Sequence, residues 1–128
     1  DNHIAYCFAE KKGYSKFGSY AGNGNDDGTY VHLGFSPAWI LVKRTNASGW
    51  SWYLNDNVRK TFNTNSTSLF PNSSNVESSD AMYLDMLSNG FKMRGTGNAV
   101  NNSSGSHIYM AFAESPFVTS SGVPVCAR

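Results

Sequence analysis

The sequence predicts an all-β domain, an antiparallel β-sandwich of the jelly-roll or lectin-like kind. Short segments with alternating apolar residues recur along the chain, roughly eight or nine of them at intervals of about 8–15 residues. Gly, Asn, Ser and Thr, which favour turns and loops, separate these segments. The one stretch that could be a helix, residues 80–87, alternates Met82, Leu84 and Met86 as a strand does, and we expect a strand there.

The first half of the chain predicts four strands and one long turn. Aromatic residues mark the first strand at 14–20, and the Gly-, Asn- and Asp-rich residues 21–28 form the turn before the second strand at 29–35. Residues 38–45 are the most apolar stretch, so we expect a strand that is buried on both faces at its start. Residues 49–56 follow a hairpin turn and alternate as a half-buried strand does.

The second half combines polar loops with a hairpin and a closing strand. Residues 57–62 are expected to form a short strand or turn, and the Asn- and Ser-rich residues 63–79 a long surface loop pinned by Leu69 and Phe70. Ser-Asn-Gly at 88–90 is a strong turn signal. The remaining expected elements are a strand at 91–95, a polar loop at 96–106 and a closing strand at 107–114.

The closing strand occurs twice in the chain. Residues 3–10 (HIAYCFAE) match residues 107–114 (HIYMAFAE), and both copies predict a central strand covered on both faces. A repeat of roughly 100 residues is too long for a solenoid unit and has the size of a whole domain. We therefore expect residues 1–10 to be the closing strand of a preceding unit, or of this one in circular order. Residues 11–118 would form the sandwich domain and residues 119–128 an extended C-terminal tail.

Charge and hydropathy exclude two classes of partner. The formal net charge of +1 argues against nucleic acid, because phosphate binding needs a basic patch. No apolar run approaches the roughly 18 residues of a membrane helix, so no membrane insertion is expected. Cys7 and Cys126 are open to two interpretations, a disulfide that ties the tail to the first strand or a buried free thiol at Cys7.

The turn at 21–28 is a weak candidate for a calcium site. Asn25, Asp26 and Asp27, with Asn23 before them, could present oxygen ligands. The loop lacks the glutamate that completes an EF-hand, and its spacing fits no calcium motif. A solvated hairpin loop is the alternative, and we expect no cofactor.

A second candidate site is aromatic. Trp50, Trp52 and Tyr53 could stack on sugar rings, with Asn55 and Asp56 supplying hydrogen bonds. The alternative is that the two tryptophans share the core face of their strand. Tyr53, on the opposite face, is then the more exposed candidate.

No arrangement of residues predicts catalysis. A glycosidase needs two carboxylates at a defined separation, and the spacing of the carboxylates fixes no such pair. The histidines show no spacing typical of a metal site or of a Ser/His/Asp triad. The residues concerned are Glu10, Glu77, Asp80, Asp85, Glu114, His3, His32 and His107. We therefore expect a protein that is not an enzyme.

Several segments in order resemble a known family. They are residues 14–25 (YSKFGSYAGNGN), 34–44 (GFSPAWILVKR), 88–92 (SNGFK), 95–97 (GTG) and 109–117 (YMAFAESPF). Together they resemble a repeat domain of unknown function found in tail and fibre proteins of marine, cyanophage-like tailed phages. The resemblance implies tandem units on the outer surface of the virion, with other virion proteins and a host-surface polysaccharide or protein as partners. It supplies no catalytic or binding residue.

The function expected from this resemblance is that of a non-catalytic C-terminal unit of a tail fibre or adhesin. The alternatives are a capsid fibre or decoration protein with no receptor role, and a secreted carbohydrate-binding module. A fibre predicts a homo-oligomer, with a trimer favoured, and the absence of heptads means that its contacts would lie on the sandwich faces or upstream. The tail residues Val118, Val123 and Val125 could also pack on a neighbour, so deleting 119–128 should then weaken association.

Overall fold

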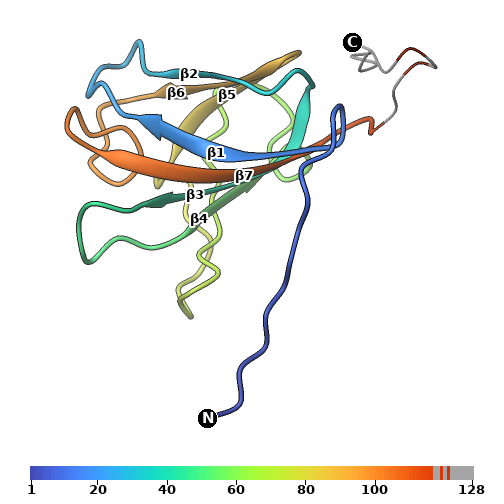
Figure 1. The fold of residues 1–128 in the computed structure, drawn as a ribbon. Helices are drawn as coiled ribbons and strands as arrows, with labels where there is room; N and C mark the ends of the chain where they lie inside the picture. Colours follow the sequence, from blue (N-terminus) through green and yellow to red (C-terminus); the bar gives the residue numbers. More distant parts are fainter. Residues whose placement is uncertain (117–118, 120, 122–128) are drawn as a thin grey trace.

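Seven strands in two antiparallel sheets make up the fold. The computed structural model describes residues 1–116, 119 and 121. Sheet A has the strand order β1-β7-β3-β4, and sheet B, which faces it, has the order β2-β6-β5 (Figure 1). The strands are β1 (Ser15–Ala21), β2 (Tyr30–His32), β3 (Pro37–Arg44), β4 (Tyr53–Asp56), β5 (Tyr83–Leu87), β6 (Gly90–Arg94) and β7 (Ser106–Ala113). The predicted all-β sandwich is confirmed, and the described residues include no helix that is long and apolar enough to cross a membrane.

Strands are fewer and shorter than the sequence pattern predicts. Residues 57–62 form no strand, and β4 begins only at Tyr53. The pairing of β3 with β4 starts at Val42 opposite Tyr53. Before that point the carbonyl of Trp50 accepts a hydrogen bond from the Lys43 ammonium, so the chain leaves the ladder.

The hairpin of β5 and β6 confirms the strand predicted for residues 80–87. Leu87 pairs with Gly90, which leaves Ser88 and Asn89 as a two-residue loop. Gly90 is required by a close approach, because a Cβ at this position would lie 2.1 Å from the carbonyl oxygen of Val31. A larger residue here would push β2 away from β6.

β7 is the central strand of sheet A, as predicted for residues 107–114. It pairs with β1 on one side and with β3 on the other. His107, Tyr109 and Ala111 point inward and are buried. Ile108 and Met110, on the other side of the strand, stay partly accessible, so the prediction that both faces are covered is wrong for the outer face.

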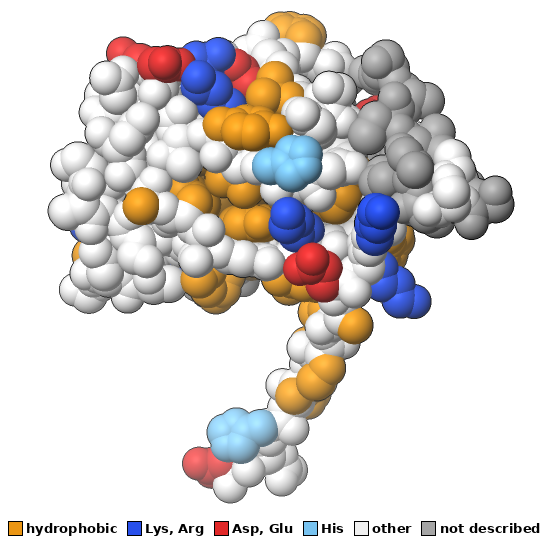
Figure 2. Space-filling view, turned by 45° about the horizontal axis from the view of Figure 1, so that its top comes forward, with side chains coloured by type: hydrophobic (Ala, Val, Ile, Leu, Met, Phe, Trp, Pro, Cys, Tyr) orange, Lys and Arg blue, Asp and Glu red, His pale blue; other side chains and the backbone are white. Residues whose placement is uncertain are grey.

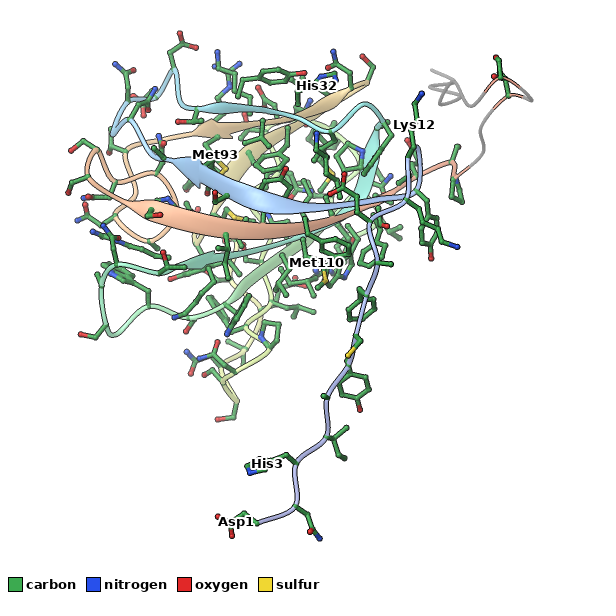
Figure 3. All side chains as sticks on the ribbon, in the orientation of Figure 1. Asp1, His3, Lys12, His32, Met93 and Met110 are labelled. Carbon is green, nitrogen blue, oxygen red and sulfur yellow. The ribbon has the colours of Figure 1, made fainter. Side chains whose placement is uncertain are left out.

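Residues 1–10 contain no strand and lie outside both sheets. The segment runs away from the domain as an extended chain, and Ile4 and Tyr6 are 83% and 82% exposed (Figures 1 and 3). In this structure the segment therefore pairs with neither sheet, and a place in a preceding unit stays a prediction. Cys7 is exposed rather than buried. Cys126 and the tail residues Val118, Val123 and Val125 lie outside the described residues.

Apolar side chains from both sheets fill the space between them. Phe91 lies at the centre, with edge-to-face ring contacts to Tyr20 at 6.0 Å and to Tyr109 at 5.5 Å between centroids. Met93 lies between the two sheets, as Figure 3 shows. The fully buried side chains around them include Ile40, Val42, Met82, Leu84 and Ala111.

A histidine inside this core makes stability depend on pH. His107 is buried and its ring stacks on Tyr20, with centroids 4.9 Å apart. Burial lowers the pKa of His107 below its usual value, and the charge of Arg44 lowers it further. Below a pH of about 6.5 the unfolded chain therefore binds a proton that the folded chain does not. The free energy of unfolding should fall there, by at most about 1.4 kcal/mol per pH unit, until the folded pKa is reached.

Urea unfolding over this pH range checks the expectation. His107→Phe keeps a stacked ring without a titrating group, so its stability should change less with pH than that of the wild type. His32→Ala, which removes an exposed histidine, serves as the control and should follow the wild-type profile. Equal profiles for the wild type and His107→Phe would show that His107 is not the source.

Candidate functional site

The aromatic platform predicted around Trp50 does not form. Tyr53 is 8% exposed and packs on Phe70, with ring centroids 5.4 Å apart, so its prediction as the exposed residue is wrong. Burial raises the pKa of Tyr53. Trp50 packs against the core, and Trp52 lies before β4, where its backbone N–H donates to Asn72 Oδ1. With Tyr53 buried and Trp50 against the core, the three rings do not form an exposed platform.

Asn55 is structural rather than ligand-binding. It is fully buried and its amide donates to Asn65 Oδ1 at 3.1 Å and accepts from Ser68 Oγ at 2.6 Å. Asn65 and Ser68 are buried as well, so residues 63–79 are not simply a surface loop. Leu69 pairs with Leu54 as expected of an anchor.

Asp56 also serves the fold. It forms an ion pair with Arg59 at 2.6 Å, and Arg59 reaches on to Glu77 at 2.8 Å. Partial burial acts to raise the pKa of Asp56, but hydrogen bonds from Arg59 and Val58 outweigh it and hold the pKa below its usual value. The five residues predicted for sugar binding therefore do not form one exposed group, because Tyr53 and Asn55 are buried.

Hydrogen bonds within the predicted calcium loop, from backbone N–H groups to side-chain oxygens, stabilise its conformation. The side-chain oxygen of Asn23 accepts from the N–H of Asn25, and that of Asn25 accepts from the N–H of Asp27. Asp27 forms an ion pair with Lys92. Among the described residues, no three His, Cys, Asp or Glu side chains come close enough to hold a metal ion. Asp26, the other carboxylate of the loop, lines a hollow on the surface.

The outer face of sheet B carries most of the polar and aromatic side chains of its strands. Alternate residues point away from sheet A, and we call this surface the sheet B face. It consists of Tyr30 and His32 from β2, Tyr83 and Asp85 from β5, and Lys92 and Arg94 from β6. In Figure 2, acidic and basic side chains gather over one end of this face, next to hydrophobic side chains and a histidine.

Ion pairs fix the charged side chains of the sheet B face. Arg94 contacts Asp85 at 2.6 Å and Asp27 at 3.5 Å, while Lys92 bonds to Asp27. The hydrogen bond from Lys92, and then its charge, hold the pKa of Asp27 below its usual value. The loop that carries Asp26 and Asp27 is thereby tied to β6.

A hollow of about 310 Å³ opens at the end of this face. Tyr83 borders it with 39% of its surface exposed, and its hydroxyl donates to Asp80 at 2.7 Å. This hydrogen bond raises the pKa of Tyr83, so the phenol stays a donor at neutral pH. The charged and backbone groups around the hollow are those of Asp26, Asp80, Arg94, Gly95, Thr96 and Gly97.

A buried amide positions the walls of the hollow. Asn101 is fully buried, and its Nδ2 donates to the carbonyl oxygens of Asn25 and Gly95 and to Asn23 Oδ1. Its Oδ1 accepts from the N–H of Asn23. One side chain thus joins the loop that carries Asp26 to the chain at Gly95 that follows β6.

A second hollow, of about 200 Å³, lies on another part of the molecule. Its lining includes Ser36, Lys60, Phe62, Asn63 and Glu114. Phe62 is its exposed aromatic residue, but it lies in a loop outside any strand. Tyr83, in contrast, is held by a strand and by Asp80. A ring fixed in advance loses less entropy on binding, so the hollow at Tyr83 is the better candidate.

The sequence did contain a signal for this site. In the two strands of the β5–β6 hairpin, Tyr83 and Arg94 occupy the polar side of each alternation. An aromatic residue on the polar side of a strand is exposed, and an exposed aromatic residue next to charge is typical of binding surfaces. The register that places Tyr83 opposite Arg94 appears only in the structure.

Comparison with known proteins gives one match. Residues 1–116, which include both sheets, match the family described as "Domain of unknown function (DUF7483)". No curated protein matches the chain, and no solved structure does.

Proposed function

The chain belongs to the DUF7483 family, and we propose that it is a non-catalytic virion module, a unit of a phage tail fibre or adhesin that contacts the host surface. Its ligands are neutral glycans of a host-surface polysaccharide, bound at the hollow beside Tyr83. The virion setting rests on the resemblance of segments such as 34–44 and 109–117 to phage tail and fibre proteins. The other virion proteins of the fibre, and further copies of the chain in a trimer, are its partners.

The observation that carries the proposal is the exposed ring of Tyr83 between Asp80 and Arg94. The apolar face of a pyranose ring packs on an aromatic ring, and its hydroxyl groups bond to carboxylate and guanidinium groups at the rim. Asp80 already holds the tyrosine hydroxyl, and Arg94 is held by Asp85. The binding groups are therefore fixed before the ligand arrives.

The charge of the site favours neutral sugars over acidic ones. The two cations of the sheet B face, Lys92 and Arg94, are already paired with Asp27 and Asp85. Asp26 and Asp80 add negative charge at the hollow. An anionic polysaccharide would meet repulsion there, whereas the hydroxyl groups of a neutral hexose can donate to these carboxylates.

Weak binding at one hollow is sufficient in a fibre. Several copies of one site on one particle act together, and their combined affinity can exceed that of one site by a factor of about 10²–10⁴. The shallow hollow of about 310 Å³ suits such a role.

A glycan array with the purified protein tests the proposal. Neutral glycans should give a signal that is unchanged by a calcium chelator. Tyr83→Ala should weaken the signal by about tenfold or more, which corresponds to about 1.4 kcal/mol.

The matched variant is Phe62→Ala, which removes the exposed aromatic residue of the second hollow. It should leave the signal unchanged. If Phe62→Ala abolishes binding and Tyr83→Ala does not, the second hollow is the site. An array without signal would favour a capsid fibre or decoration protein, and turnover of the glycans would contradict a non-catalytic role.

A further inference from the structure

Sheet A has an apolar outer face that sheet B does not cover. The registers align Phe17, Met110, Leu41 and Leu54 in one row across all four strands. These four side chains point away from the core, because their neighbours Ile40 and Val42 on β3 point into it. In Figure 3, Met110 lies on the side of β7 that faces away from sheet B.

Further apolar side chains extend this surface on both sides of the central row, and we call the whole surface the sheet A face. Phe112 and Trp39 lie on one side of the central row, with ring centroids 5.5 Å apart. Ile108 lies on the other side and is 39% exposed. Leu69, which pairs with Leu54, continues the central row and is 40% exposed. An apolar surface that runs across a whole sheet is typical of an interaction site.

Few charged side chains lie on this face. The charged residues at the aligned positions of β3 and β4 are Lys43 and Asp56. The ammonium of Lys43 donates to the neutral carbonyl of Trp50, and Asp56 pairs with Arg59. A face with so little charge offers no basis for a partner recognised by charge, which favours an apolar contact with a second copy of this chain.

The N-terminal segment supplies a matching apolar surface. Ile4, Tyr6 and Phe8 alternate along residues 3–10, and the ring of Phe8 packs on the sheet A face, with centroids 5.9 Å from Phe112 and 6.3 Å from Phe17. Ile4 and Tyr6 are exposed, and the chain runs past the edge of the domain to His3 and Asp1 (Figure 3). The family match covers residues 1–116 and therefore includes this segment.

The areas also suit a second copy. Four strands about 4.8 Å apart and about six residues long present roughly 400 Å². A stable interface takes roughly 800 Å² from each partner. An extended apolar segment added from each copy supplies much of the difference, so the sheet A face and residues 3–8 together form a surface large enough for self-association.

We propose that the sheet A face of one copy binds residues 4–6 of a second copy. Such a contact is reciprocal in a dimer and closes into a ring in a trimer. Phe8 stays packed on its own domain, while Ile4 and Tyr6 extend to the neighbouring copy. The inference does not depend on sugar binding, which takes place on the opposite sheet.

The mass of the protein in solution tests this proposal. Light scattering of the full 128-residue protein should give the mass of a dimer or trimer. Tyr6→Ser and Ile108→Glu should each reduce it to the monomer mass with the circular dichroism spectrum unchanged. Val76→Ser removes an equally exposed apolar residue in a loop and should leave the mass unchanged. A wild-type monomer, or an equal mass for the wild type and both variants, would overturn the proposal.

Cross-linking identifies the segment and the face that meet. A protein with Cys7→Ser and Cys126→Ser keeps Tyr6 and Ile108, receives Ala5→Cys beside Tyr6 and Ser19→Cys opposite Ile108, and is treated with a short bifunctional maleimide. Products should join two chains. In the control, Tyr83→Cys on sheet B replaces Ser19→Cys and should give no such product. Products within one chain, or equal yields for the two proteins, would contradict exchange of the segment between copies.

Discussion

Phe91→Ala is expected to lower the free energy of unfolding by about 3–5 kcal/mol, the range for truncating a buried phenylalanine. The ring of Phe91 is fully buried and contacts Tyr20 of β1 and Tyr109 of β7. It therefore joins sheet B to both strands at one side of sheet A. A domain of this size has a total stability of about 5–15 kcal/mol, so the variant should be close to unfolding at room temperature.

Urea denaturation followed by tryptophan fluorescence checks this expectation. The midpoint should fall strongly for Phe91→Ala. Phe62→Ala removes the same side chain from an exposed loop position and should change stability by no more than about 0.5 kcal/mol. Similar midpoints for the two variants would mean that Phe91 is not the centre of the core.

Asn101→Ala should lower the free energy of unfolding by about 2–6 kcal/mol, although it removes only one amide. The amide makes four hydrogen bonds, and each contributes about 0.5–1.5 kcal/mol. The loop that carries Asp26 should then move away from Gly95, and sugar binding should fall even where the protein is still folded.

The control for this variant is Asn75→Ala, at an exposed loop asparagine. Its unfolding midpoint and its glycan-array signal should both equal those of the wild type. If Asn101→Ala also unfolds at the wild-type urea concentration, the loop is held by other contacts and Asn101 does not position the site.

The alternation of apolar residues predicted most strands but could not decide which side of a strand faces the core. In residues 49–56 the alternation predicts that the tryptophans and Leu54 face the core, yet Tyr53 and Asn55 point inward. The polar amide of Asn55 can be buried in the core because Asn65 and Ser68 satisfy its hydrogen bonds. Both faces of sheet A are apolar, so hydropathy alone gives no preference.

The candidate site depends on contacts between segments far apart in the sequence. Asp26 and Asp80 reach one hollow because Asn101 ties the loop at 21–28 to Gly95 and Asp27 of that loop pairs with Lys92 of β6. The spacing of residues along the chain does not predict such a contact. Turn chemistry, in contrast, is local, and the hairpin at residues 88–90 was therefore predictable.

Titration of the ¹⁵N-labelled protein with neutral monosaccharides tests the central claim most directly, because the amide signals report where a sugar binds. We expect saturable shifts for Tyr83, Arg94, Gly95 and their neighbours on the sheet B face, with none on the sheet A face. The same titration of Tyr83→Ala should show no saturable shift. Saturable shifts centred on Trp52 or Phe62, or none with any sugar, would contradict the account.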